Sequence, residues 1–162
     1  MKNKKVLFQL VALFGFALFI GMKWYRHNVV PELPFYAQDL KKEDGSLVKA
    51  RDLKGKYILV SYFQSWCGDC ARELPSIEKL QTEVGKEKIN IVLVSDEEFV
   101  KINKFRNQFK SQLPFFQSVN TFDKIGIHVF PTTYLLSPEG EILLSKLEGY
   151  DWSSKDVLTL IQ

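Results

Sequence analysis

The sequence is poor in the residues that bind metals or build disulfide scaffolds. It has only two cysteines among 162 residues, which excludes a disulfide-rich fold. It also has only two histidines, His27 and His128. A protein zinc site needs four ligands, or three and a water, so zinc is at most a minor alternative. We expect neither a metal site nor a cofactor.

Excess charge of one sign is also scarce. The formal net charge is +3, and Lys2, Lys4 and Lys5 are the only charged residues before Lys23. Without those three lysines, 19 basic residues stand against 19 acidic ones. A nucleic-acid-binding protein would normally carry a basic face. We therefore expect no nucleic-acid partner.

Residues 6–22 carry no charge at all. As a helix this run would be about 25 Å long, and extension to Trp24 and Tyr25 gives about 30 Å, the thickness of a bilayer core. Apolar residues occur all round the helix, which does not suit a core helix packed on one face. The small residues of a signal-peptidase site are scarce, since only Gly21 is small near its end. We expect an uncleaved membrane anchor over residues 1–25, with a cleaved signal peptide as the alternative.

The basic residues around this run indicate an orientation. Three lysines precede it, while Lys23 and Arg26 follow it. The positive-inside rule then favours a cytoplasmic N-terminus. Residues 26–33 would form a short extended tether because prolines disfavour regular structure there. Residues 34–162 would form one domain outside the cytoplasm, periplasmic or at the cell surface.

The pattern of residues 34–162 predicts an α/β fold. The runs Tyr57–Phe63 and Ile89–Ser95 have the length and composition of buried strands. A helix between them makes the two strands parallel, whereas the turn Ser137–Gly140 makes its flanking strands antiparallel. The result is a mixed central sheet flanked by helices on both faces. We expect strands at 34–40, 47–50, 57–63, 89–95, 132–136 and 141–147, and helices at 70–84, 96–110, 121–126 and 153–161. Pro75 should kink the first of these helices. The second should carry a core stripe of Phe99, Ile102, Phe105 and Phe109.

The residues Trp66-Cys67-Gly68-Asp69-Cys70 lie where the first buried strand gives way to a helix. A helix N-terminus favours a thiolate and should lower the pKa of Cys67. The two-residue spacer allows Cys70 to close a disulfide with Cys67. A purely structural disulfide would constrain little of the unfolded chain across so short a loop. This placement of a C-x-x-C motif is typical of a thiol–disulfide redox site.

The motif WCGDC, then Glu73 and Pro75 in ARELP, and then VFPTTYLLSPEG resemble the thioredoxin fold, in particular its membrane-tethered TlpA/ResA-like thiol–disulfide oxidoreductases. The resemblance spans residues 34–162. It implies a catalytic Cys67–Cys70 pair and a cis peptide bond before Pro131. It also implies a set of residues that bind the client protein, namely Trp66, Phe130 and Pro131.

One position matches the family with its role left open, and two positions depart from the family pattern. Glu73 matches a glutamate of the family, so it is either a relay for the Cys70 proton or a solvated helix residue. Ser61 stands where thioredoxin has a buried aspartate, so that base is missing. Asp69 replaces the usual proline, and its charge should raise the pKa of the Cys67 thiol. Weaker stabilisation of the thiolate favours a reductant over a strong oxidant.

The resemblance implies that Cys67 attacks a client disulfide and that Cys70 resolves the mixed disulfide. With no further cysteine, an external thiol donor must restore the dithiol. We expect this donor to be membrane-bound. Family members serve cytochrome c maturation and other envelope proteins, which makes these candidate clients. Two alternatives stay open. A thioredoxin-fold peroxidase would place Thr or Ser where Gln64 stands, and a copper-binding chaperone would use the paired thiolates for Cu(I) with a longer spacer.

Overall fold

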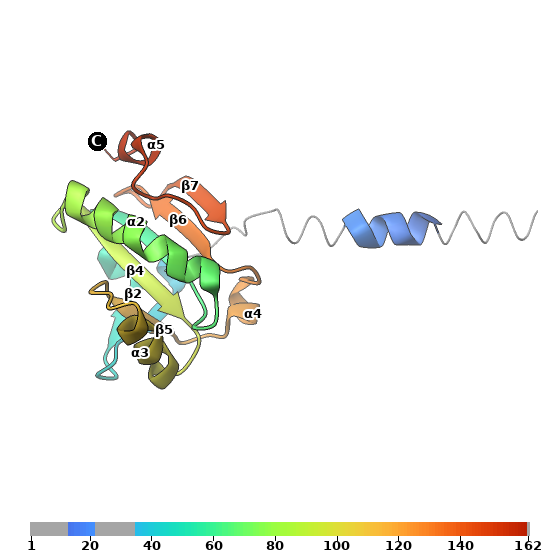
Figure 1. Ribbon diagram of the computed structural model, residues 1–162, viewed down its shortest axis with the longest axis horizontal. Coiled ribbons are helices and arrows are strands. Elements are labelled where there is room, and N and C mark those ends of the chain that lie inside the picture. The colour runs from blue at the N-terminus through green and yellow to red at the C-terminus, as the bar shows by residue number, and fades with distance from the viewer. Residues whose placement is uncertain (1–12, 22–34, 162) are drawn as a thin grey trace, which may run out of the picture. The chain divides into compact units, whose positions relative to one another are not determined.

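The structure, a computed structural model, describes residues 13–21 and 35–161 (Figure 1). The chain divides into two units, residues 1–30 and 31–162. In the first unit, residues 13–21 are helical. Among the described residues, no helix combines the length and apolar character needed to cross a membrane. The predicted anchor at 1–25 lies outside the described residues except for 13–21, and the predicted tether at 26–33 lies entirely outside them.

The second unit is built on one seven-stranded sheet with the order β2-β1-β5-β4-β3-β6-β7. Its three central strands are parallel, and all other neighbours pair antiparallel. The predicted mixed sheet is therefore confirmed. The strands are β1 (Asp39–Lys41), β2 (Leu47–Lys49), β3 (Tyr57–Tyr62), β4 (Ile89–Ser95), β5 (Phe115–Ser118), β6 (Thr132–Leu136) and β7 (Ile142–Leu147).

Helices cover both faces of this sheet. The connections β3 to β4 and β4 to β5 are made by α2 (Gly68–Val84) and α3 (Phe99–Gln108), and Figure 1 shows α2 lying across the sheet. Side chains alternate between faces along a strand, so Leu59, Ile91 and Leu93 share one core with α2, α3 and α5 (Lys155–Leu158). On the opposite face, the Tyr62 ring packs against Phe122 of α4 (Phe122–Ile125). The short helices η1 (Phe35–Ala37) and η2 (Ala50–Leu53) precede and follow the β1–β2 hairpin.

Two of the predicted strand assignments need correction. The strand β5 was not expected, because it has only four residues, all of them buried, and shows no alternation that distinguishes it from other apolar segments. The predicted strand at 34–40 is instead the turn η1 followed by the short β1. The Gln38 N–H donates to the Phe35 carbonyl at 3.0 Å, which closes this turn before pairing with β2 begins.

The predicted helices also differ at their ends. The helix α3 begins at Phe99, not at 96, because the Ser95 hydroxyl accepts from the Glu97 N–H at 3.2 Å and holds a turn there. Phe109 lies beyond its last turn and is 41% exposed, so it does not complete the predicted core stripe. The helix α5 is limited to Lys155–Leu158, and α2 continues through Pro75.

Candidate active site

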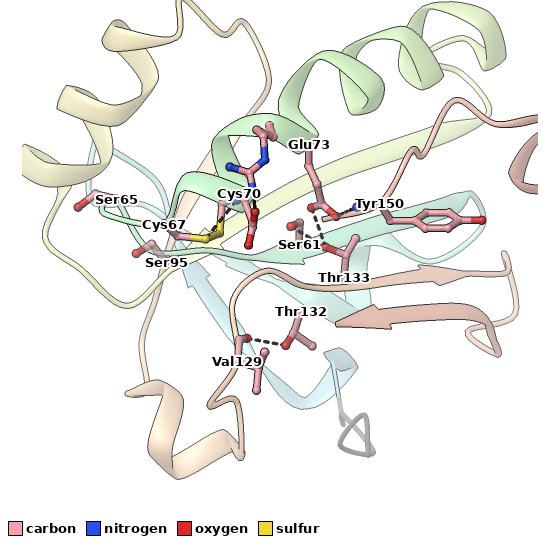
Figure 2. Close-up of a disulfide and its surroundings, with 12 residues drawn as sticks. Ser61, Ser65, Cys67, Cys70, Glu73, Ser95, Val129, Thr132, Thr133 and Tyr150 are labelled. Carbon is pink, nitrogen blue, oxygen red and sulfur yellow. Dashed lines mark hydrogen bonds and ion pairs between the residues drawn. A yellow bond between two sulfur atoms is a disulfide. The ribbon is translucent and has the colours of Figure 1, made fainter. Parts of the chain in front are cut away.

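The two cysteines form a disulfide at the N-terminus of α2 (Figure 2). Cys67 is the N-cap of the helix, and its Sγ accepts from the Cys70 N–H at 3.1 Å. The Cα atoms of the pair are 5.3 Å apart. The first sulfur therefore lies at the positive end of the helix, where a thiolate is favoured, and the second lies one turn inside it. The predicted disulfide between the two cysteines of this motif is confirmed.

Glu73 lies one turn further along α2, and its side chain points into the protein rather than to solvent (Figure 2). It is only 2% exposed, so the alternative of a solvated helix residue is wrong. One carboxyl oxygen, Oε1, accepts from the Tyr150 N–H and from the Trp152 Nε1–H, both at 3.0 Å. Burial outweighs these hydrogen bonds and raises the pKa of Glu73 to about 7. This carboxyl can therefore take up or release a proton near neutral pH.

The other carboxyl oxygen of Glu73 joins a chain of hydroxyl groups on the sheet. Oε2 lies 3.3 Å from the Thr133 Oγ1, which lies 2.8 Å from the Ser61 Oγ. A hydroxyl donates only one proton, so the chain can run in either direction. A protonated Glu73 donates to Thr133, and an ionised Glu73 accepts from it. Ser61 does not replace the missing aspartate as a base, but it completes a network that tolerates both states of Glu73.

Of the three predicted client-binding residues, Trp66 and Phe130 lie against each other next to the redox motif, whereas Pro131 is buried. The Phe130–Pro131 peptide bond is cis, as the resemblance implies. Trp66 is 72% exposed, and its ring centroid lies 5.9 Å from that of Phe130 in an edge-to-face arrangement. Within residues 35–161, the backbone N–H and carbonyl of Phe130 have no hydrogen-bond partner. An extended peptide could pair with this backbone, although the binding of a client here stays a prediction.

Asp69 does not act on Cys67 as an isolated charge. Its carboxylate forms an ion pair with Arg72 on the next turn of α2, and both side chains are substantially exposed. The cation offsets part of the negative charge near the sulfur. The expected effect of Asp69 on the Cys67 thiol is therefore smaller than the sequence alone suggests.

Two acidic residues that the sequence analysis did not single out hold the loop before Cys67. Glu97 accepts from both the N–H and the hydroxyl of Ser65, at 2.6 and 3.0 Å. Asp96 accepts from the Gln64 Nε2 at 2.7 Å. One signal could have revealed them. Both follow β4 directly, and the carboxyl ends of adjacent parallel strands meet at one edge of a sheet.

A cavity of about 620 Å³ opens beside Glu73. The first turns of α2 form one wall, from Asp69 to Ser76, and residues 148–151 form the other. This second wall is held against α2, because the Ser76 hydroxyl accepts from the Trp152 N–H at 3.2 Å. Glu73 is one of the residues that line this cavity.

Comparison with known proteins agrees with this geometry. Residues 32–145 match the AhpC/TSA family. The thiol-disulfide oxidoreductase ResA of Oceanobacillus iheyensis is 31% identical, over 91% of this chain and 85% of the relative. ResA of Halalkalibacterium halodurans is 30% identical, but that match spans only 67% of this chain and 62% of the relative.

Solved structures show the same fold. The thioredoxin domain of a thiol-disulfide oxidoreductase from Bacteroides vulgatus has a TM-score of 0.68 at 24% identity, covering 84% of this chain and 97% of that one. A thiol:disulfide interchange protein from a Bacteroides species has a TM-score of 0.67 at 25% identity, covering 76% and 85%. The predicted resemblance to thioredoxin-fold oxidoreductases is confirmed.

Proposed function

The chain belongs to the AhpC/TSA family of thioredoxin-fold proteins, and from this premise we propose that it is a thiol–disulfide oxidoreductase that reduces client disulfides outside the cytoplasm. The observation that carries the proposal is the Cys67–Cys70 disulfide across the first turn of α2. A sulfur pair in this position can be opened and closed without rearrangement of the fold, because both residues already lie in one helical turn.

The reaction starts from the reduced pair. The Cys67 thiolate attacks one sulfur of the client disulfide, so a Cys67–client bond forms and the client's other sulfur leaves as a thiolate. The Cys70 thiolate then attacks the Cys67 sulfur and releases the client's second sulfur. The client gains two electrons, and the protein is left with the Cys67–Cys70 disulfide that the structure contains.

The second attack requires that Cys70 lose its proton. We assign the acceptor role to Glu73, which lies one turn away on the same helix and has a pKa of about 7. A base of ordinary glutamate pKa would rarely hold a proton at neutral pH, whereas this one can accept and then release it.

The location and partners of the protein are also part of the proposal. The uncharged run 6–22 supports a single-pass anchor, and the lysines before it support a domain on the outer side of the membrane. The sequence contains no third cysteine, so an external thiol donor must reduce the pair after each turnover, and a donor in the same membrane suits an anchored domain. Disulfide-containing envelope proteins, including apo-cytochromes c, are the candidate clients.

A trapping experiment tests this mechanism. Cys70→Ser leaves Cys67 able to attack but removes the resolving sulfur, so the mixed disulfide should accumulate. Reduced Cys70→Ser protein incubated with oxidised insulin is expected to give a covalent adduct on non-reducing gels that dithiothreitol releases. Cys67→Ser is the matched control, since it removes one sulfur from the same turn and should form far less adduct. Equal adduct from both variants, or rapid turnover of hydrogen peroxide without any adduct, would contradict the proposal.

A further inference from the structure

One carboxylate ties together two segments that are far apart in the sequence. Asp96 directly follows β4, and each of its oxygens accepts a different hydrogen bond. Oδ1 accepts from the Gln64 Nε2 at 2.7 Å, and Oδ2 accepts from the Phe122 backbone N–H at 2.8 Å. Bonds of this length to an ionised acceptor are among the stronger hydrogen bonds in proteins.

The first of these bonds leads to the nucleophile. Gln64 is 8% exposed, and its backbone carbonyl accepts from the Cys67 N–H at 3.0 Å. This bond closes the turn between β3 and α2 that presents Cys67. Because Asp96 holds the Gln64 side chain, it also holds the residue at which that turn begins.

The second bond leads to the helix that supports Phe130. Phe122 is the first residue of α4, is 2% exposed, and has its ring centroid 5.5 Å from that of Phe130. Phe130 contacts the exposed Trp66 and precedes Pro131. The hydrogen bonds of Asp96 therefore reach the turn of Cys67 on one side and the support of the Phe130–Pro131 segment on the other.

We propose that Asp96 is a positioning residue for client capture, which sets the spacing between the Cys67 turn and the Phe130–Pro131 segment. This inference rests on the proposed function, since a protein client must bind to the turn and the segment at once. A carboxylate suits the role because both segments offer N–H donors and only an ionised carboxyl offers two acceptor oxygens. A small reagent that reacts with Cys67 alone does not need this spacing.

The test compares Asp96→Ala with Asp156→Ala, a matched control that removes an exposed carboxylate from α5, an element that belongs to neither the Cys67 turn nor the Phe130–Pro131 segment. With oxidised insulin as substrate, Asp96→Ala is expected to raise KM by about tenfold and to leave kcat within about twofold. Alkylation of the reduced protein by iodoacetamide should stay within about twofold of wild type in both variants. An unchanged insulin KM for Asp96→Ala would overturn the positioning role. A fall in its alkylation rate as large as the rise in its insulin KM would overturn it as well.

A pair of exchanges makes the test independent of a simple loss of stability. Gln64→Glu places two carboxylates against each other and should raise the insulin KM at least as much as Asp96→Ala does. Adding Asp96→Asn restores a complete set of hydrogen bonds. The amide nitrogen introduced at position 96 donates to the carboxylate introduced at position 64, and the amide oxygen at position 96 still accepts from the Phe122 N–H. The double variant should return to within about threefold of the wild-type KM. A double variant as impaired as Gln64→Glu alone would overturn the proposal, even if Asp96→Ala fails to fold.

The activity of the wild-type protein distinguishes a failure of this inference from a failure of the proposed oxidoreductase function. A wild type that does not reduce insulin overturns the proposed function and this inference with it. A wild type that reduces insulin, beside an Asp96→Ala variant with the same KM, overturns the positioning role alone.

Discussion

Cys67→Ser is expected to lower the rate of insulin reduction on the order of a thousandfold or more. A serine hydroxyl is almost entirely protonated at neutral pH and does not attack a disulfide sulfur. The remaining Cys70 cannot substitute for it, because it lies one turn inside α2, away from the helix N-terminus that favours a thiolate. The measurement is the initial rate of insulin reduction with dithiothreitol as the electron donor, corrected for the rate without protein.

The control for this prediction lies on the same helix. Thr82→Ala removes a hydroxyl from an exposed position of α2, near the end opposite to the disulfide, and should leave the rate unchanged. Thermal unfolding of both reduced variants checks that the fold is intact. A Cys67→Ser protein that keeps a tenth of the wild-type rate would contradict the assignment of Cys67 as the nucleophile.

Glu73→Gln is expected to stabilise the oxidised protein at pH 8 by up to about 3 kcal/mol, with little effect near pH 4.5. The sign follows from burial. The folded state raises the pKa of Glu73 from 4.5 to about 7, so between these values the folded protein holds a proton that the unfolded chain has lost. The free energy of unfolding of the wild type therefore falls as the pH rises through this window. Glutamine stays neutral and can keep the hydrogen bonds to Tyr150, Trp152 and Thr133.

Urea unfolding of the oxidised proteins at pH 4.5 and pH 8 measures this difference. Glu83→Gln makes the same chemical change on an exposed part of α2 and should alter stability by less than about 0.5 kcal/mol at both values. The insulin reductase activity of Glu73→Gln should also lose any pH dependence centred near pH 7. Equal stability effects at both pH values, or a variant less stable at pH 8, would show that Glu73 is not a buried carboxyl with a raised pKa.

The sequence predicts the parts of the fold that have long patterns. The runs that became β3 and β4 are continuous and apolar, and α2 between them has helical spacing, so the parallel pair and its crossover follow from local sequence. The redox motif is equally local, because four residues contain both sulfurs. The strand β5 has no such pattern, since Phe115–Ser118 owes its pairing to β4 and β1 rather than to its own composition.

The partners of the candidate site residues are less predictable, because they depend on contacts across the fold. Nothing near Glu73 in the sequence indicates that Trp152 and the Tyr150 backbone donate to its carboxyl. The sequence therefore allows either a buried or a solvated Glu73 side chain. Asp96 falls in a stretch that was expected to be helical. Its role depends on Gln64 and Phe122, which are 32 and 26 residues away in the chain.

The central claim is that Cys67 and Cys70 transfer two electrons to a client disulfide as a pair. Fully reduced protein, freed of excess dithiothreitol, can be mixed with oxidised insulin, quenched with an alkylating reagent and weighed by mass spectrometry. One Cys67–Cys70 disulfide should form for each insulin disulfide that is lost. Loss of insulin disulfides while both protein thiols remain alkylatable, or oxidation of the pair without any insulin thiols, would contradict it.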